Sequence, residues 1–110
     1  MEISIQDSGE IKVLYFEGSL DTNTAPDAQK RMDEVIEQGN HKILIQLEKL
    51  DYVSSAGLRI LLVVAKKLKK SEGELRICQI NDDVREVFEI SGFDTILSVF
   101  DNESEALKEF

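Results

Sequence analysis

The chain has 110 residues, of which 42% are hydrophobic and 32% are charged, and these values fit a single soluble globular domain spanning residues 1–110. Its 22 acidic and 13 basic side chains give a net charge of −9, which argues against binding to nucleic acid or to an anionic membrane. The single cysteine, Cys78, excludes an internal disulfide, and the N-terminus is too polar for a signal peptide. We therefore expect a cytoplasmic protein.

The first part of the chain predicts a β-hairpin followed by a helix. Isoleucines at positions 3 and 5 alternate with polar residues, and after a turn a second strand is expected over residues 11–17. A loop is expected at residues 18–23. Thr24 is then expected to cap a helix that ends at Gly39.

The middle of the chain predicts a central strand and a long helix. Residues 42–47 include three consecutive branched apolar side chains, which is typical of a strand buried on both faces. Residues 56–70 read as a helix that is apolar around much of its circumference and carries lysines at its C-terminal end. Ser54 and Ser55 lie at the junction, where a serine can cap the free N–H groups of the helix.

The last part of the chain continues the alternation of strands and helices. The expected elements are a strand over residues 74–80, a helix capped by Asn81 or Asp82 and closed by Gly92, a strand over residues 95–100 and a short helix after Asn102. The order ββαβαβαβα predicts an α/β domain with a mixed sheet of about five strands and about four helices. An antiparallel hairpin begins this sheet, and parallel βαβ crossovers follow it.

The sequence contains no convincing active site. His41 precedes the strand at 42–47, whereas Ser54 and Ser55 follow it, so that about 20 Å separates the histidine from either serine. No glycine-rich phosphate loop and no His/Cys cluster with metal spacing is present. We therefore expect no catalytic residue, no metal and no cofactor, although Asp21 and Asp51 are acidic residues expected in loops.

Two loops are candidates for a binding site. One loop is residues 17–22, and the other contains the two serines. If the strands that precede these loops are neighbours, both loops lie at the carboxyl edge of one sheet, which open α/β sheets use for binding. The candidate contact residues at this edge are Asp21, Thr22, Asn23, Ser54, Ser55, Ala56, Gly57, Leu58 and Arg59. For Thr22, Asn23 and Thr24, an ordinary role in the turn or cap is the simpler interpretation.

Four segments together resemble a STAS domain of the bacterial anti-sigma factor antagonist type. They are EGSLDT at 17–22, HKILIQL at 41–47, LDYVSSAGLRILL at 50–62 and INDDVREVFEISGFDTIL at 80–97. The resemblance covers essentially the whole chain in order and spacing. It implies a mixed sheet with helices and a phosphorylatable serine at the N-terminus of a central helix.

The resemblance also implies a role for individual residues. Alignment on Gly57 and Leu58 places Ser55 at the phosphorylated position and Ser54 where the family commonly has aspartate, which leaves Ser54 as a second phosphate acceptor. Asp21 matches an acidic residue that lies near the phosphorylation site and the kinase contact in the family.

The implied function is partner switching in transcription regulation. The unphosphorylated chain would bind an anti-sigma factor, which is a serine kinase of the GHKL fold, and so release the sigma factor. Phosphorylation of Ser55 would end this binding, and a metal-dependent serine phosphatase would restore it. The free chain is expected to be a monomer.

Two alternatives stay open at this point. In one, the chain is a non-switching STAS scaffold subunit of a transporter or a signalling complex, in which Ser55 serves only as a helix cap. In the other, it is a small enzyme or nucleotide-binding module that uses Asp21 and Asp51.

Overall fold

The computed structural model describes residues 1–92, 97–108 and 110. In chain order its elements are β1 (Glu2–Ser8), β2 (Ile11–Leu20), α1 (Ala25–Glu37), β3 (Lys42–Val53), α2 (Ser55–Lys70), β4 (Glu74–Cys78), α3 (Asp82–Ser91), β5 (Ser98–Phe100) and α4 (Glu103–Leu107). This order confirms the predicted α/β class.

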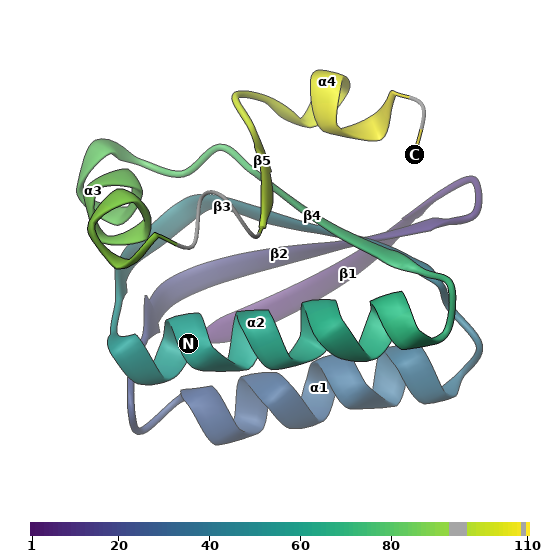
Figure 1. Ribbon diagram of the computed structural model, residues 1–110, viewed down its shortest axis with the longest axis horizontal. Coiled ribbons are helices and arrows are strands. Elements are labelled where there is room, and N and C mark those ends of the chain that lie inside the picture. The colour runs from purple at the N-terminus through teal and green to yellow at the C-terminus, as the bar shows by residue number, and fades with distance from the viewer. Residues whose placement is uncertain (93–96, 109) are drawn as a thin grey trace.

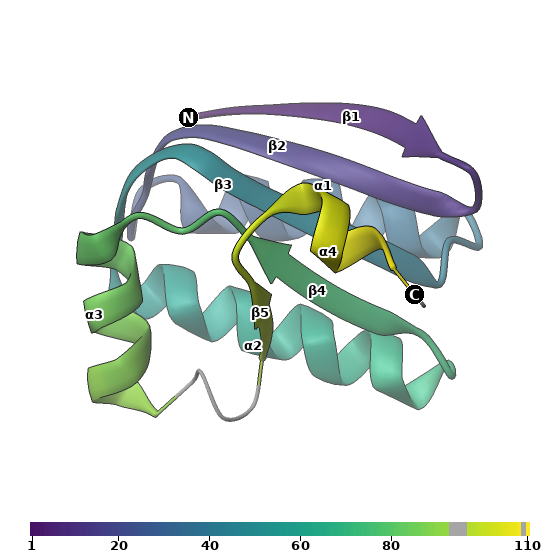
Figure 2. The same cartoon turned by 90° about the horizontal axis from the view of Figure 1, so that it is seen from above.

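The strands form one mixed sheet in the order β1-β2-β3-β4-β5 (Figure 2). β1 runs antiparallel to β2 through a two-residue turn between Ser8 and Ile11, in which Gly9 adopts a φ of +62°. The pairs β2/β3, β3/β4 and β4/β5 are parallel, with α1, α2 and α3 as the connections. The predicted hairpin followed by βαβ crossovers is therefore confirmed.

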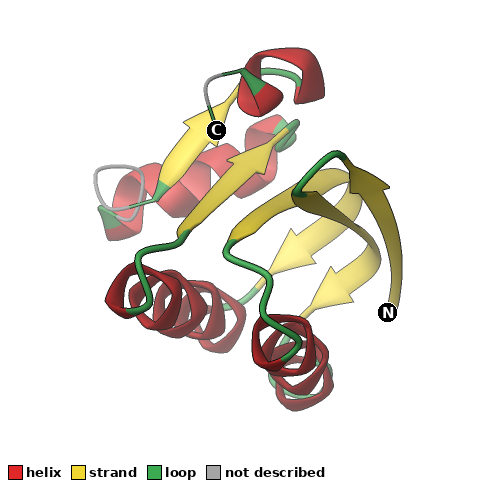
Figure 3. Ribbon diagram, turned by 90° about the vertical axis from the view of Figure 1, so that its right-hand side faces the viewer, coloured by secondary structure: helices red, strands yellow, loops and turns green. Residues whose placement is uncertain are grey.

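The helices cover the sheet unevenly. α1 and α2 lie side by side on one face, α4 lies on the other face, and α3 lies near the carboxyl ends of the strands (Figures 1 and 3). Neighbouring strand residues therefore enter different cores, because side chains alternate between the two faces. In β3, Ile45 joins the main core under α1 and α2, whereas Leu44 joins a smaller core with Cys78 and Ala106 under α4. The predicted burial of this strand on both faces is confirmed.

The two central strands are longer than expected. β2 continues to Leu20 and β3 to Val53, and these two residues pair across the sheet. The expected loop at residues 18–23 therefore begins later, and Asp51 lies in a strand, so its placement in a loop was wrong. Pairing between main chains does not depend on side-chain polarity, so the charged residues that follow residue 47 do not end the strand. Two register shifts interrupt the pairing, and Gly18 sits at one of them with a φ of +110°.

The C-terminal strands are shorter than expected. β4 ends at Cys78 because Gln79 adopts a left-handed φ of +56°, which turns the chain away from the extended path. β5 is described from Ser98 onward, and the earlier positions 95 and 96 of its predicted range lie outside the described residues. Phe93, expected to pack beyond the end of α3, also lies outside them.

The predicted caps of the last two helices are confirmed. Asn81 accepts a hydrogen bond from the N–H of Val84 over 2.8 Å at the start of α3, and Gly92 ends this helix with a φ of +76°. Asn102 caps α4 by accepting from the N–H of Glu105 over 2.8 Å.

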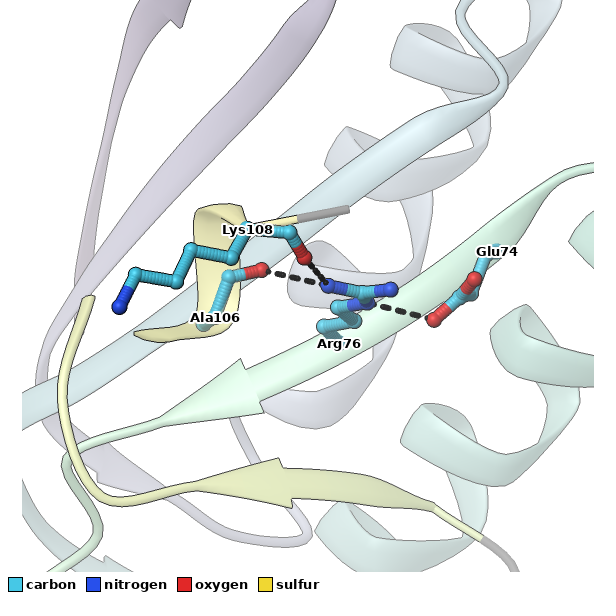
Figure 4. Close-up of polar contacts among 4 residues, drawn as sticks. All are labelled: Glu74, Arg76, Ala106 and Lys108. Atoms are coloured by element: carbon cyan, nitrogen blue, oxygen red, sulfur yellow. Dashed lines mark hydrogen bonds and ion pairs between the residues drawn. The ribbon is translucent and has the colours of Figure 1, made fainter. Parts of the chain in front are cut away.

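A buried arginine fastens α4 to the sheet (Figure 4). Nη1 of Arg76, in β4, donates to the carbonyl oxygens of Ala106 and Lys108 over 3.0 and 2.6 Å. Its Nε donates to the carboxylate of Glu74 over 2.6 Å, and its guanidinium carbon lies 4.4 Å from the centre of the Phe110 ring. Because Arg76 is only 8% exposed, these contacts compensate its charge where water is largely excluded.

Candidate functional site

The two candidate loops meet at one end of the sheet. The main-chain N–H of Ser54 donates to the carbonyl oxygen of Leu20 over 2.9 Å, and this bond joins the end of β2 to the start of α2. Figure 1 shows both loops at the same end of the molecule, where α1 and α2 begin. The expectation that they share the carboxyl edge of the sheet is therefore confirmed.

The two adjacent serines have different roles. Ser54 is the N-cap of α2: its backbone is extended, with φ −93° and ψ 173°, and its Oγ accepts from the N–H of Gly57 over 3.2 Å. Ser55 is the first helical residue and is exposed, and its hydroxyl forms no hydrogen bond with the part of the chain that the structure describes. The expectation that Ser55 caps the helix was thus wrong, because the capping position is the residue before it.

Gly57 allows α2 to start close to the sheet. A Cβ atom at this position would lie 2.7 Å from the carbonyl oxygen of Leu20, 2.8 Å from the Cγ of Leu20 and 3.0 Å from a methyl carbon of Val53. The neighbouring Leu58 is 3% exposed and belongs to the main core. Gly57 and Leu58, which were predicted as partner contacts, are therefore buried, and they hold the start of α2 against the sheet.

Asp21 fixes the shape of the other loop. Its Oδ1 accepts from the main-chain N–H groups of Asn23 and Thr24 over 2.9 and 3.0 Å. Thr24 occupies the N-cap position of α1, but its side chain makes no capping bond, because its Oγ1 accepts from the main-chain N–H of Asp21 over 2.9 Å and donates to the carbonyl oxygen of Ser19 over 2.8 Å. Asp21 is half-buried in this turn, whereas Thr22 and Asn23 are exposed.

The residues that remain accessible define what we call the carboxyl-edge surface. Its members are Thr22, Asn23, Asp51, Tyr52, Ser55, Ala56 and Arg59. Tyr52 is 53% exposed and was missed as a contact by the sequence analysis, although a large aromatic residue just before the two serines was a usable signal. Tyrosine and arginine are enriched in protein interfaces, so this composition suits a protein partner.

The Cys78 thiol and the Tyr15 hydroxyl are not activated for catalysis. Burial raises the pKa of the Cys78 thiol to about 12, which is the opposite of what a nucleophilic thiolate needs. Burial, followed by its hydrogen bond to Glu103, also raises the pKa of Tyr15. His41 lies next to the start of β3, and Ser54 follows its end.

The described residues hold no candidate metal cluster and no candidate membrane span. In residues 1–92, 97–108 and 110, no group of three or more His, Cys, Asp and Glu side chains is arranged to hold a metal ion. Over the same ranges, no helix has both the length and the apolar composition to cross a membrane.

Comparison with known proteins identifies the family of the chain and agrees with its fold. Residues 2–106 match the family model of the STAS domain. A Bordetella bronchiseptica protein named as an anti-sigma factor antagonist, BtrV, is 34% identical, and the alignment covers 100% of this chain and 95% of that protein.

Two solved structures share the fold at lower identity. A Thermotoga maritima protein named as an anti-sigma factor antagonist has a TM-score of 0.92 and 23% identity, with 97% of this chain and 92% of that chain covered. The Bacillus cell fate determinant SpoIIAA in its phosphorylated form has a TM-score of 0.73 and 22% identity, with 96% of each chain covered. The match of residues 2–106 to the family model and the 34% identity to BtrV show that the chain belongs to the STAS domain family.

Proposed function

We propose that this protein is an anti-sigma factor antagonist whose carboxyl-edge surface binds an anti-sigma factor, and that phosphorylation of Ser55 switches the binding off. The observation that carries the proposal is the exposed hydroxyl of Ser55 at the first position of α2, beside a loop fixed by Asp21. The partner is a serine kinase of the GHKL fold, which transfers the terminal phosphate of its magnesium-bound ATP to the serine and keeps the ADP. A metal-dependent serine phosphatase returns the chain to its binding form.

The environments of the two serines favour Ser55 over Ser54 as the acceptor. A kinase must reach the hydroxyl oxygen, and Ser55 is exposed, whereas Ser54 is half-buried. The Ser54 oxygen also accepts the N–H of Gly57, so a phosphate there would have to replace the cap of α2. Ser55 can be modified without loss of a hydrogen bond that the structure describes.

A phosphate on Ser55 would change the surface more than the fold. The main-chain N–H groups of Ser55 and Ala56 have no acceptor among the described residues, and the positive end of the helix dipole favours a negative group at this place. The modification adds a charge of about −1.5 to −2 at pH 7. The phosphorylated form of SpoIIAA has a fold similar to that of this chain. This similarity supports the proposal that phosphorylation changes the surface and leaves the fold intact.

The loss of affinity follows from charge at the interface. A phosphate on the exposed Ser55 adds about 1.5 to 2 negative charges and bulk to the carboxyl-edge surface, where the partner docks. Like charges that face each other at a contact cost several kcal/mol, which is enough to weaken binding by about a hundredfold or more.

Incubation of the purified chain with ATP, magnesium and the candidate kinase tests the proposal. Peptide mass mapping is expected to find one phosphate, on Ser55, and calorimetry is expected to show binding to the kinase before but not after modification. Ser55→Ala should bind without being modified, and Ser55→Asp should bind weakly. Ser54→Ala is the matched control and should still be phosphorylated on Ser55. Stoichiometric phosphate on Ser54, or equal binding before and after modification, would contradict the proposal.

The scaffold alternative makes a different prediction in the same experiment. A non-switching STAS subunit would take up no phosphate, and its partner binding would be the same in Ser55→Asp and the natural chain. Turnover of nucleotide by the chain alone would instead support the enzyme alternative.

A further inference from the structure

The outer edge of β1 presents main-chain groups that, among the described residues, are unpaired except for the Ile3 carbonyl oxygen. β1 is the outermost strand of the sheet (Figure 2). Because a two-residue turn joins Ser8 to Ile11, these two residues exchange both of their main-chain hydrogen bonds, and the direction then alternates along the strand. The even-numbered residues of β1 thus point their N–H and C=O groups toward β2, and Ile3, Ile5 and Asp7 point theirs outward.

This edge carries little of the usual protection against pairing. β1 contains no proline and no lysine; its charged residues are Glu2 and Asp7, near its two ends, and Asp7 pairs with Lys12 of β2 in the single chain. Among the described residues, the one hydrogen bond to its outward groups is long: Arg31 of α1 donates to the carbonyl oxygen of Ile3 over 3.5 Å. The opposite edge strand, β5, is only three residues long as described.

We infer that β1 pairs with β1 of a second copy of this chain in an antiparallel, two-fold symmetric dimer centred on Ile5. Ile5 is the middle residue of the strand Glu2–Ser8. Ile5 then lies opposite Ile5 of the second copy. Ile3 lies opposite Asp7 of the second copy, and Asp7 lies opposite Ile3 of the second copy. Every outward-pointing residue then faces another one, which allows about six main-chain hydrogen bonds between the copies.

The side chains agree with this register. Residues directly opposite each other lie on the same face of a sheet, so the two Ile5 side chains, each 37% exposed in the single chain, would cover each other. Asp7 of the second copy would come beside Ile3 and the guanidinium of Arg31, which already reaches the Ile3 carbonyl. Glu2 would face Ser8 of the second copy, so no like charges are opposite one another.

The partner is a second copy because β1 has Ile5 at its centre and Asp7 near one end, and Asp7 of one copy would meet Arg31 of α1 beside Ile3 of the other copy. The contact is small, and each chain carries a net charge of −9, so the dimer is expected to be weak and to depend on concentration. The monomer expected from the sequence is then the state at low concentration. The dimer through β1 does not require phosphorylation of Ser55.

A cysteine at the two-fold axis tests the register. Hydrogen-bonded antiparallel pairs have Cα atoms about 5.5 Å apart, which lies within the range of disulfides. Ile5→Cys is therefore expected to form a covalent dimer under mild oxidation, and the natural Cys78 should not react because it is buried. The matched control is Val63→Cys on α2, where the valine is 39% exposed; it is expected to cross-link at least tenfold more slowly. Equal cross-linking of the two variants would overturn the inference.

Sedimentation velocity in about 0.15 M NaCl tests the interface without cross-linking. The natural chain is expected to shift from monomer toward dimer between about 10 µM and 1 mM, whereas Ile5→Lys should stay monomeric because two lysines meet at the axis. Val63→Lys should associate like the natural chain. Arg31→Asp should weaken association, and adding Asp7→Arg should restore it. A natural chain that is monomeric at 1 mM, or an Ile5→Lys variant that dimerises equally well with unchanged circular dichroism, would overturn the inference.

Discussion

The main-chain N–H of Ser54 lies 2.9 Å from the carbonyl oxygen of Leu20, and this single hydrogen bond joins the two loops of the carboxyl edge. The bond uses only main-chain atoms, and the Asp21 turn and Gly57 support it on either side. The exposed side chains of the carboxyl-edge surface take no part in it. Their substitution is therefore expected to change binding without changing the placement of the loops.

The two serines are expected to differ in their effect on stability. Ser54→Ala removes the N-cap of α2 and should lower the free energy of unfolding by about 1 kcal/mol. Ser55→Ala removes an exposed hydroxyl at the first helical position and should change it by less than about 0.5 kcal/mol. Urea denaturation followed by circular dichroism measures both values. A larger loss in Ser55→Ala than in Ser54→Ala would mean that the capping roles are assigned the wrong way round.

Gly57→Ala is expected to destabilise the protein, although alanine is the better helix former. The added methyl group would lie 2.7 Å from the Leu20 carbonyl oxygen, which cannot move without disturbing β2. The overlap should cost about 1–3 kcal/mol, more than the gain of about 1 kcal/mol in helix propensity. Thermal unfolding and amide exchange of the Ser54 N–H measure the effect. Lys66→Ala, on the exposed side of the same helix, is the control, and an increase in stability in Gly57→Ala would contradict the close approach.

Arg76→Met is expected to loosen α4. The variant loses the charged hydrogen bonds to Ala106 and Lys108 and the stacking on Phe110, which together should lower the free energy of unfolding by about 2–3 kcal/mol. Hydrogen exchange of the α4 amides should increase more than that of α2. Arg85→Met is the control because its ion pair with Asp101 is exposed, so its loss should cost less than about 1 kcal/mol. Equal effects of the two substitutions would mean that Arg76 does not hold the helix.

Cys78 is expected to make the protein less stable at alkaline pH. Burial raises the pKa of its thiol to about 12 in the folded chain, whereas the pKa of an unfolded thiol is about 8.5. Between these values the unfolded state releases the proton and the folded state keeps it, so the free energy of unfolding falls as pH rises. Tyr15, whose pKa is also raised, acts in the same direction at higher pH.

The pH dependence can be assigned to Cys78 by substitution. Between pH 8 and pH 10.5, the free energy of unfolding measured by urea denaturation should fall more steeply for the natural chain than for Cys78→Ala. The comparison uses the slopes, so a difference in stability between the two proteins at pH 8 does not affect it. The thiol of the folded chain should also react with a disulfide reagent at pH 8 far more slowly than that of the urea-unfolded chain. Parallel pH slopes for the two proteins would contradict the assignment.

Local patterns in the sequence predicted much of the fold. The alternating isoleucines of β1, the apolar run at the start of β3 and the caps at Asn81 and Asn102 each identify an element by short-range chemistry. The strand ends were less predictable. β3 continues beyond Leu47 through charged residues because β2 lies beside it, and no local pattern states which strand is the neighbour.

Some features of the candidate site could be predicted from the sequence, and others could not. The sequence by itself determined that a helix begins near two serines and that an acidic loop precedes another helix, because capping and turn formation depend on residues close in the chain. Only the tertiary structure decided that Ser55 is exposed, that Gly57 is needed for contact with Leu20, and that β1 lies at an open edge. These properties depend on which distant segments pack together, and packing is a property of the whole folded chain.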